Sequence, residues 1–288
     1  MSLRNLPEAK TFARPQNYQW DAPSDVLSRW AEAGPMAASE DDATISVLDF
    51  IGEDFWSGTG VTAKRISAAL RSIGEKPVTV QINSPGGDMF EGIAIYNLLR
   101  AHPAKVTVEV LGWAASAASI IAMAGDEIRM GLGTFVMVHN AWGIVIGNRH
   151  DMRDAADLFD GFDGALADIY QARTGLKRAE VEKLMDAETF MGPSEAVEKG
   201  FADAVDEKIS GKTGEDKKNA AHRERLMARR QTEAALARAG FTRDRRSEIL
   251  AELQAPAALR DASRNPNAAR DAGVKVAAIR RLIETMRS

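Results

Sequence analysis

The stretch Gly112-Trp113-Ala114-Ala115-Ser116 decides how the middle of this 288-residue chain folds. An alternating apolar run over Val106–Val110 precedes it and predicts a strand, and a small-residue apolar segment over 117–124 follows it and predicts a helix. Ser116 therefore stands where a strand gives way to a helix. Free helix amides and the positive end of the helix dipole favour a developing alkoxide at such a position.

Two other stretches complete a chemical pattern around this serine. Ile82–Gly87, with the sequence INSPGG, ends another expected strand, and an apolar run after Gly131 leads directly to His139. A serine needs a neutral imidazole nearby to take its proton. His139 follows an apolar strand and is displayed at a sheet edge, whereas His102 lies on a polar loop and His150 at a helix start. The pattern is typical of the nucleophile, base and oxyanion loop of a serine hydrolase.

These motifs closely resemble those of the Clp peptidase (ClpP) family of serine proteases. INSPGG, GWAAS and MVH occur in the family's order and spacing, and a fourth match runs from Arg173-Thr-Gly through Glu188-Thr-Phe to the segment 193–203. The resemblance spans Thr44 to Asp206. Any one motif is a weak signal, but four in register are a strong one. With Glu-Thr-Phe and long flanking segments, the chain is most similar to the Clp-related head maturation (prohead) proteases of tailed phages and prophages.

The hydrophobic pattern favours an α/β fold with a largely parallel sheet, because expected strands alternate with expected helices. The resemblance implies the ββα spiral of Clp peptidases and crotonases. Strands are expected over 44–51, 78–83, 106–111, 127–130, 134–138 and 202–205, and helices over 66–73, 88–99, 117–124, 150–173 and 177–185.

Composition divides the chain into three regions. Residues 1–42 are polar and interrupted by prolines, which predicts a partly disordered N-terminal arm. By the resemblance, residues 43–210 are expected to form a Clp-type serine peptidase domain. Residues 211–288 hold 18 basic and 10 acidic residues, net +8, whereas the remainder holds 19 and 31, net −12. This shift predicts a basic, mainly helical C-terminal tail, with helices over 219–239, 243–253 and 274–286, that suits an acidic assembly partner.

The resemblance assigns roles to individual residues. Ser116 is the expected nucleophile and His139 the expected base. The amides of Gly87 and of Ala117, the residue after the nucleophile, are expected to form the oxyanion hole. Gly86 and Gly112 are expected to let a substrate backbone approach closely.

The third member of the triad is open between two acids. The family's spacing places Glu188 where most Clp peptidases carry aspartate, so Glu188 is the first candidate to orient the imidazole. Asp186 would project to the same side of an extended segment and is the alternative. A site in which neither acid is essential is the third possibility.

Several classes of protein are excluded by composition. No apolar run approaches 18 residues, so no membrane span is expected. The chain has no cysteine, and its four histidines form no His-x-x-x-His pair, so we expect neither disulfides nor a metal site, and no organic cofactor. The N-terminus carries no apolar signal core, which favours the cytoplasm, of the host or within the phage prohead. The basic segment 222–230 contains glutamate and predicts a solvated helix face, so no nucleic acid partner is expected.

The favoured function is that of a serine endopeptidase that matures phage heads by cleaving scaffold or capsid precursor. The alternatives are a Clp peptidase coupled to an ATP-dependent unfoldase, a capsid scaffold or assembly protein on a peptidase fold, and a crotonase-type acyl-CoA enzyme. By resemblance the chain forms heptameric rings stacked as a tetradecamer. The apolar face Ala155–Ile169 of the long helix is expected to be buried where two rings meet.

Overall fold

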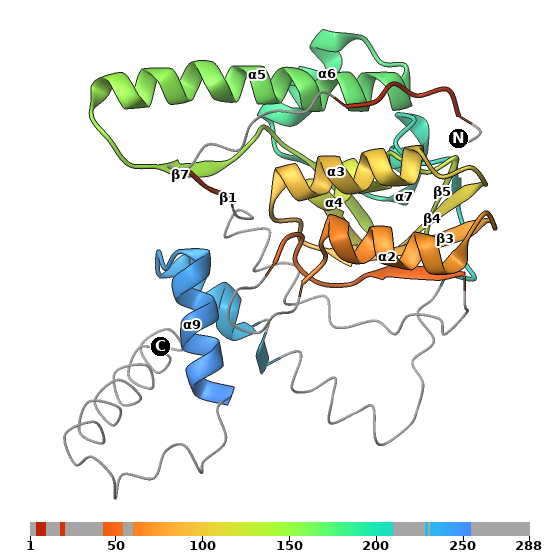
Figure 1. The fold of residues 1–288 in the computed structure, drawn as a ribbon. Helices are drawn as coiled ribbons and strands as arrows, with labels where there is room; N and C mark the ends of the chain where they lie inside the picture. Colours follow the sequence, from red (N-terminus) through yellow and green to blue (C-terminus); the bar gives the residue numbers. More distant parts are fainter. Residues whose placement is uncertain are drawn as a thin grey trace, which may run out of the picture. The chain divides into compact units, whose positions relative to one another are not determined.

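A seven-stranded sheet positions the residues singled out above (Figure 1). In this computed structural model the described residues are 4–9, 18–20, 43–53, 60–209, 228–229 and 231–254. Five strands run parallel in the order β2 (Thr44–Val47), β3 (Val78–Ser84), β4 (Val106–Ala115), β5 (Glu127–Met130) and β9 (Ala204–Val205). β6 (Phe135–Val138) pairs in parallel with the last residues of β4, and β8 (Thr189–Met191) pairs antiparallel with β6.

The strand β4 is central to the sheet, because two different strands pair with one of its edges. Its first half, to Val110, pairs with β5, whereas Trp113–Ala115 pairs with β6. On the other edge its register with β3 shifts between Ile82 and Ser84. The side chain of Asn83 fills this irregularity, since its Oδ1 accepts the amide of Trp113 at 3.2 Å.

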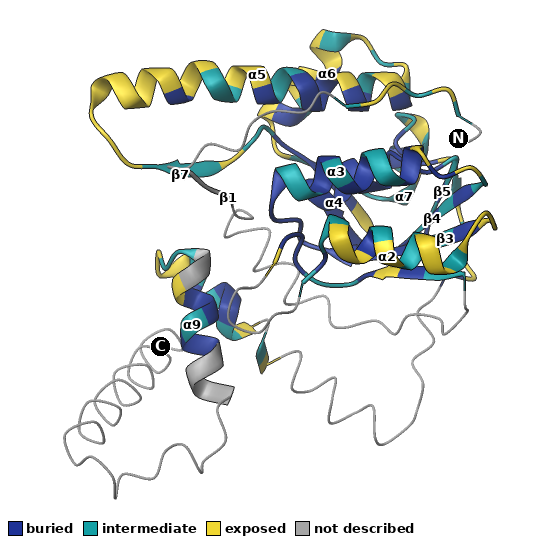
Figure 2. Cartoon of the chain, viewed as in Figure 1, coloured by how far each residue is buried: buried dark blue, intermediate teal, exposed yellow. Residues whose placement is uncertain are grey.

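Helices cover the sheet and enclose the core. They are α2 (Ala63–Ile73), α3 (Met89–Arg100), α4 (Ala117–Ala122), α5 (Arg149–Thr174), α6 (Arg178–Asp186) and α7 (Pro193–Glu198). Figure 1 shows α5 as the long helix at the top of the view, with α6 beside its end. The strands β3 and β4 and the helices α3 and α4 supply many of the buried apolar side chains (Figure 2).

The expected α/β class and parallel sheet are confirmed, and most expected elements lie within a few residues of their predicted bounds. Three differences matter for the site. The strand predicted over 106–111 continues to Ala115 and thus reaches Ser116 itself. The strands β7 (Gly143–Val145) and β8 were not predicted. The N-terminal region contributes β1 (Tyr18–Trp20), which pairs antiparallel with β7.

The apolar face of α5 is buried largely within its own chain. Phe162, Leu166 and Ile169 are core residues, and the ring of Phe162 packs edge-on against Phe90 with the centroids 5.5 Å apart. The expectation that the whole face Ala155–Ile169 serves contact between rings is therefore wrong for these residues. The chain's own core is therefore the apolar surface that these three residues cover.

Near the C-terminus, a helical segment over 231–238 packs on the sheet. Ala234 is buried in an apolar cluster with Phe50, Trp113, Ala115 and Met137. The helix α9 (Arg243–Gln254) follows, and the fully buried Arg246 lies 3.9 Å from Glu233.

Contacts divide the chain into the units Met1–Ser247 and Glu248–Ser288. The boundary after residue 210 stays a prediction, and the helix expected over 274–286 lies outside the described residues. Within the described ranges, no helix combines the length and apolar character that a membrane crossing requires.

Candidate active site

Ser116 occupies a strained turn between β4 and α4. Its backbone has φ 55° and ψ −127°, in the region that non-glycine residues rarely adopt. The amide of Ser116 donates to the carbonyl of Met137 at 3.0 Å, so the turn is fastened to the neighbouring strand β6. Strain of this kind persists only where the surrounding structure holds it, and it concentrates at functional sites.

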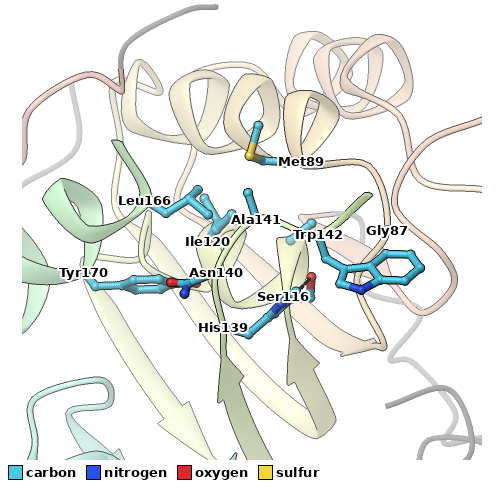
Figure 3. A pocket seen from close by; sticks show the side chains of 11 residues that line it. Gly87, Met89, Ser116, Ile120, His139, Asn140, Ala141, Trp142, Leu166 and Tyr170 are labelled. Atoms are coloured by element: carbon cyan, nitrogen blue, oxygen red, sulfur yellow. Dashed lines mark hydrogen bonds between the residues drawn. The ribbon is translucent and has the colours of Figure 1, made fainter. Parts of the chain in front are cut away.

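Ser116 and His139, predicted as a pair, lie in direct hydrogen-bonding contact. Nε2 of His139 is 2.6 Å from Oγ of Ser116 (Figure 3). The pairing of β4 with β6 explains the contact: Ala115 is opposite Met137, and each catalytic candidate is the first residue after the end of its strand. Both residues are buried, with 8% and 7% of their surfaces exposed. Burial excludes competing water and strengthens the hydrogen bond between the two side chains.

The glycine loop predicted to form the oxyanion hole lies against the nucleophile. Gly86 has φ 92°, and a Cβ atom added to it would lie 2.6 Å from both Ser116 Cβ and the carbonyl oxygen of Ala115. Gly87 forms an isolated β-bridge with Ile51. The amide of Ile51 donates to the carbonyl of Gly86 at 2.9 Å. Only glycine permits this approach, so the loop can lie against Ser116 because Gly86 and Gly87 have no side chains.

A pocket brings together four of the predicted residues, Ser116, His139, Gly87 and Ala117, whereas Gly86, Glu188 and Asp186 do not line it. It is lined by Gly87, Met89, Ser116, Ala117, Ile120, His139, Asn140, Ala141, Trp142, Leu166 and Tyr170. The expected substrate-approach residue Gly112 is not among them; it packs against the Asn83 side chain, with an added Cβ 2.6 Å from Oδ1. In the described part of the chain, no group of three or more His, Asp or Glu side chains is placed to hold a metal ion.

Behind the nucleophile lies a series of hydrogen bonds that the sequence did not predict. Ser119 Oγ donates to the Ser116 carbonyl at 2.6 Å and lies 2.8 Å from the Tyr170 hydroxyl. Because the Ser119 proton goes to a carbonyl, which can only accept, Tyr170 is the donor in the second bond. Burial raises the pKa of Tyr170 well above its usual range, and the bond with Ser119 only partly opposes this, so the phenol stays protonated. These hydrogen bonds fix the first turn of α4.

The two acids proposed for the third position are placed differently. Thr189, the first residue of β8, is opposite Val138 in β6, so Glu188 follows in register beside His139. Its side chain is exposed, and among the described residues no hydrogen bond or ion pair joins it to the imidazole. Asp186 instead accepts a hydrogen bond from Asn140 Nδ2 at 2.8 Å.

Glu188 shares one unusual property with Ser116. Within the described residues, these are the two non-glycine residues with positive φ, at 47° and 55°. The left-handed turn at Glu188 follows the end of α6 and directs the chain into β8. Both conformations cost free energy, roughly 1–3 kcal/mol each, that the packing around them must offset.

A buried serine–imidazole pair, set at the end of a parallel strand beside a glycine loop, has the chemistry of a serine hydrolase. Comparison with known proteins identifies the family. The model of the Clp protease family matches residues 60–208. The ATP-dependent Clp protease proteolytic subunit of Deinococcus radiodurans is 33% identical over 145 residues, which cover 49% of this chain and 71% of the relative. The chain thus belongs to the Clp protease family, a family of serine peptidases.

A solved structure supports the fold independently. A ClpP1 mutant from Listeria monocytogenes aligns with a TM-score of 0.50 at 22% identity, over 58% of this chain and 92% of that one. At this identity the likeness concerns the fold alone. It confirms the Clp-type architecture that the motifs implied.

Proposed function

We propose that the chain is a serine endopeptidase in which Ser116 is the nucleophile and His139 the general base. The observation that carries the proposal is the 2.6 Å contact between His139 Nε2 and Ser116 Oγ, in a pocket that Gly87 and Ala117 also line. Membership of a serine peptidase family supports the same roles.

The reaction follows from this geometry. His139 Nε2 takes the proton of Ser116 Oγ as the oxygen attacks the carbonyl carbon of the scissile peptide. The carbonyl oxygen becomes an oxyanion, which the amides of Gly87 and Ala117 stabilise by donating to it. His139 then gives its proton to the leaving amine. A water molecule, activated by the same imidazole, hydrolyses the acyl-enzyme and restores the serine.

Glu188 is proposed to orient the His139 ring in this cycle. The register of β6 and β8 supports the assignment, because it brings the two backbones side by side. Its exposed side chain would have to turn towards the imidazole. Asp186 is the alternative acid, although its present partner is Asn140.

Substitutions test these roles directly. Ser116→Ala and His139→Ala are expected to abolish hydrolysis of fluorogenic peptides at unchanged folding, and Ser194→Ala, which alters an exposed serine, is the matched control. For the acid, Glu188→Gln is expected to lower kcat strongly and Asp186→Asn to lower it little. The reverse result would transfer the orienting role to Asp186.

The biological role that we propose is phage head maturation, the cleavage of scaffold or capsid precursor. It is supported by the flanks outside the family match, residues 1–59 and 209–288, and by the net charge of +8 over 211–288, which suits an acidic assembly partner. We place this reaction in the cytoplasm of the host or in the prohead. Purified chain is expected to cleave capsid precursor without ATP.

The second candidate role is that of a peptidase fed by an unfoldase. It is favoured by the name of the Deinococcus relative, an ATP-dependent proteolytic subunit. Protein cleavage that needs both ATP and an added unfoldase would support it and contradict the head maturation role.

We also propose that the chain works as a homo-oligomer of stacked heptameric rings. The first turn of α5 and the residues just before it are the surface available for such contact, since Ile146 is 84% and Met152 43% exposed. On this proposal, the contact lies nearer the N-terminal end of α5 than the sequence indicated.

A further inference from the structure

The segment Asn140–Trp142, directly after His139, forms one wall of the active-site pocket. It lies between the end of β6 and the start of β7, where no strand pairing holds it. Figure 3 shows Ala141 and Trp142 near Met89 and Gly87, with His139 and Ser116 beside them. The position of this wall therefore depends on contacts from other elements.

Two carboxylates from neighbouring helices make those contacts. Asp163 on α5 accepts the backbone N–H of Ala141 at 2.5 Å. Asp186, the last residue of α6, accepts from the Asn140 side chain at 2.8 Å. Asp163 is the better anchored of the two, because its neighbour Phe162 is fully buried in the core.

The surroundings of Asp163 make its charge depend on pH near neutrality. Burial raises the pKa of Asp163 to about 6, the hydrogen bond from Ala141 opposes the rise, and the acidic side chains of Asp160 on α5 and Asp186 on α6 add to it. The neighbouring Arg178 is engaged with Asp168 and Glu182. Above pH 6 the group is a carboxylate, which is the stronger acceptor for the amide, and below pH 6 it is a neutral acid.

We propose that Asp163 is a positioning residue for peptide hydrolysis: its carboxylate holds the Ala141 amide and so sets the pocket wall that adjoins His139. The proposal rests on the proposed function of Ser116 and His139. Asp163 touches neither reacting side chain and acts through the backbone of the segment 140–142. Protonation of Asp163 weakens its hydrogen bond with the Ala141 amide. Peptide substrates, which must lie along this wall, then react more slowly.

The dependence of kcat/KM on pH between 5 and 9 tests the proposal with three variants. Asp163→Asn keeps an acceptor oxygen but cannot titrate, and Asp163→Ala removes the acceptor. Asp157→Asn, an exposed aspartate on the same helix, is the matched control. Thermal unfolding of each variant checks that the fold is kept.

The expected result concerns the acid limb of the profile. In the wild type, protonation of Asp163 adds to the loss that protonation of any general base causes on this limb, so log kcat/KM falls with a slope greater than one. Asp163→Asn should fall with a slope of one, and its kcat/KM at pH 8 should already lie below that of the wild type, because its neutral amide is a weaker acceptor than the carboxylate. Asp163→Ala should lose roughly ten- to a hundredfold in kcat/KM at pH 8, the worth of a hydrogen bond to a charged group.

Equal acid slopes in the wild type and Asp163→Asn would overturn the proposal, as would an Asp163→Ala enzyme within twofold of the Asp157→Asn control. Labelling of the wild type by a fluorophosphonate separates this failure from failure of the site itself. If Ser116 is labelled but the slopes are equal, only the role of Asp163 is wrong. If Ser116 is not labelled, the proposed function is wrong.

Discussion

Replacing Gly86 by alanine should lower the rate of catalysis, because the added methyl group pushes the glycine loop away from the nucleophile. The added Cβ would lie 2.6 Å from Ser116 Cβ and from the Ala115 carbonyl oxygen. Carbon atoms in contact prefer about 3.5–4.0 Å, so the glycine loop and the nucleophile must separate by roughly 1 Å. A misplacement of that size costs about 100-fold in rate. The affected atoms are the backbone of Ser116 and the loop that presents the Gly87 amide.

Gly74→Ala is the matched control for this experiment. Gly74 also has positive φ, 74°, but an added Cβ meets nothing within 4 Å. Both variants therefore carry the backbone strain, roughly 1–3 kcal/mol, and only Gly86→Ala carries the collision. Urea unfolding should give a loss of stability that is larger for Gly86→Ala than for Gly74→Ala, by the roughly 1–3 kcal/mol that overpacking costs. Peptide hydrolysis should give about 100-fold lower kcat/KM for Gly86→Ala alone. Activity of Gly86→Ala within threefold of Gly74→Ala would refute the proposed role of the loop.

Three further predictions concern the surroundings of the site. Tyr170→Phe removes the donor to Ser119 and should lower the free energy of unfolding by about 1–3 kcal/mol, measured by urea denaturation; an unchanged value would contradict this series of buried hydrogen bonds. Changing both Ile146 and Met152 to serine should lower the particle mass measured by light scattering, and a wild type that is already monomeric would exclude the ring. Truncation after Ser247 should preserve labelling of Ser116. Truncation after residue 210 removes Ala234 from the apolar cluster around Trp113 and should promote aggregation. A shorter chain that stays monodisperse and active would support the domain boundary at 210.

The parts of the fold and site that the sequence predicted are those encoded in short stretches. Ser116 and His139 each end an apolar strand, and parallel strands bring such ends together, so their contact could be expected from local pattern. Gly86 and Gly87 were equally visible, because a glycine pair after a strand indicates a close backbone approach.

The parts that were missed depend on contacts between distant residues. The bond from Ala141 to Asp163 spans 22 positions and the bond from Ser119 to Tyr170 spans 51, and neither residue pair has a local signature. The short strands β7 and β8 have three residues each, too few for a period to show. The apolar face of α5 was recognised as buried, but the helical pattern carries no information on whether its own core or a second copy covers it.

The most direct test of the central claim is the site of modification by a fluorophosphonate. After reaction and proteolysis, mass spectrometry should find the adduct on the peptide that contains Ser116. The rate should fall strongly in His139→Ala and stay unchanged in Ser194→Ala, because only the imidazole at 2.6 Å activates the hydroxyl. An adduct on another serine, or a rate that does not depend on His139, would contradict the assignment of this pair as the catalytic centre.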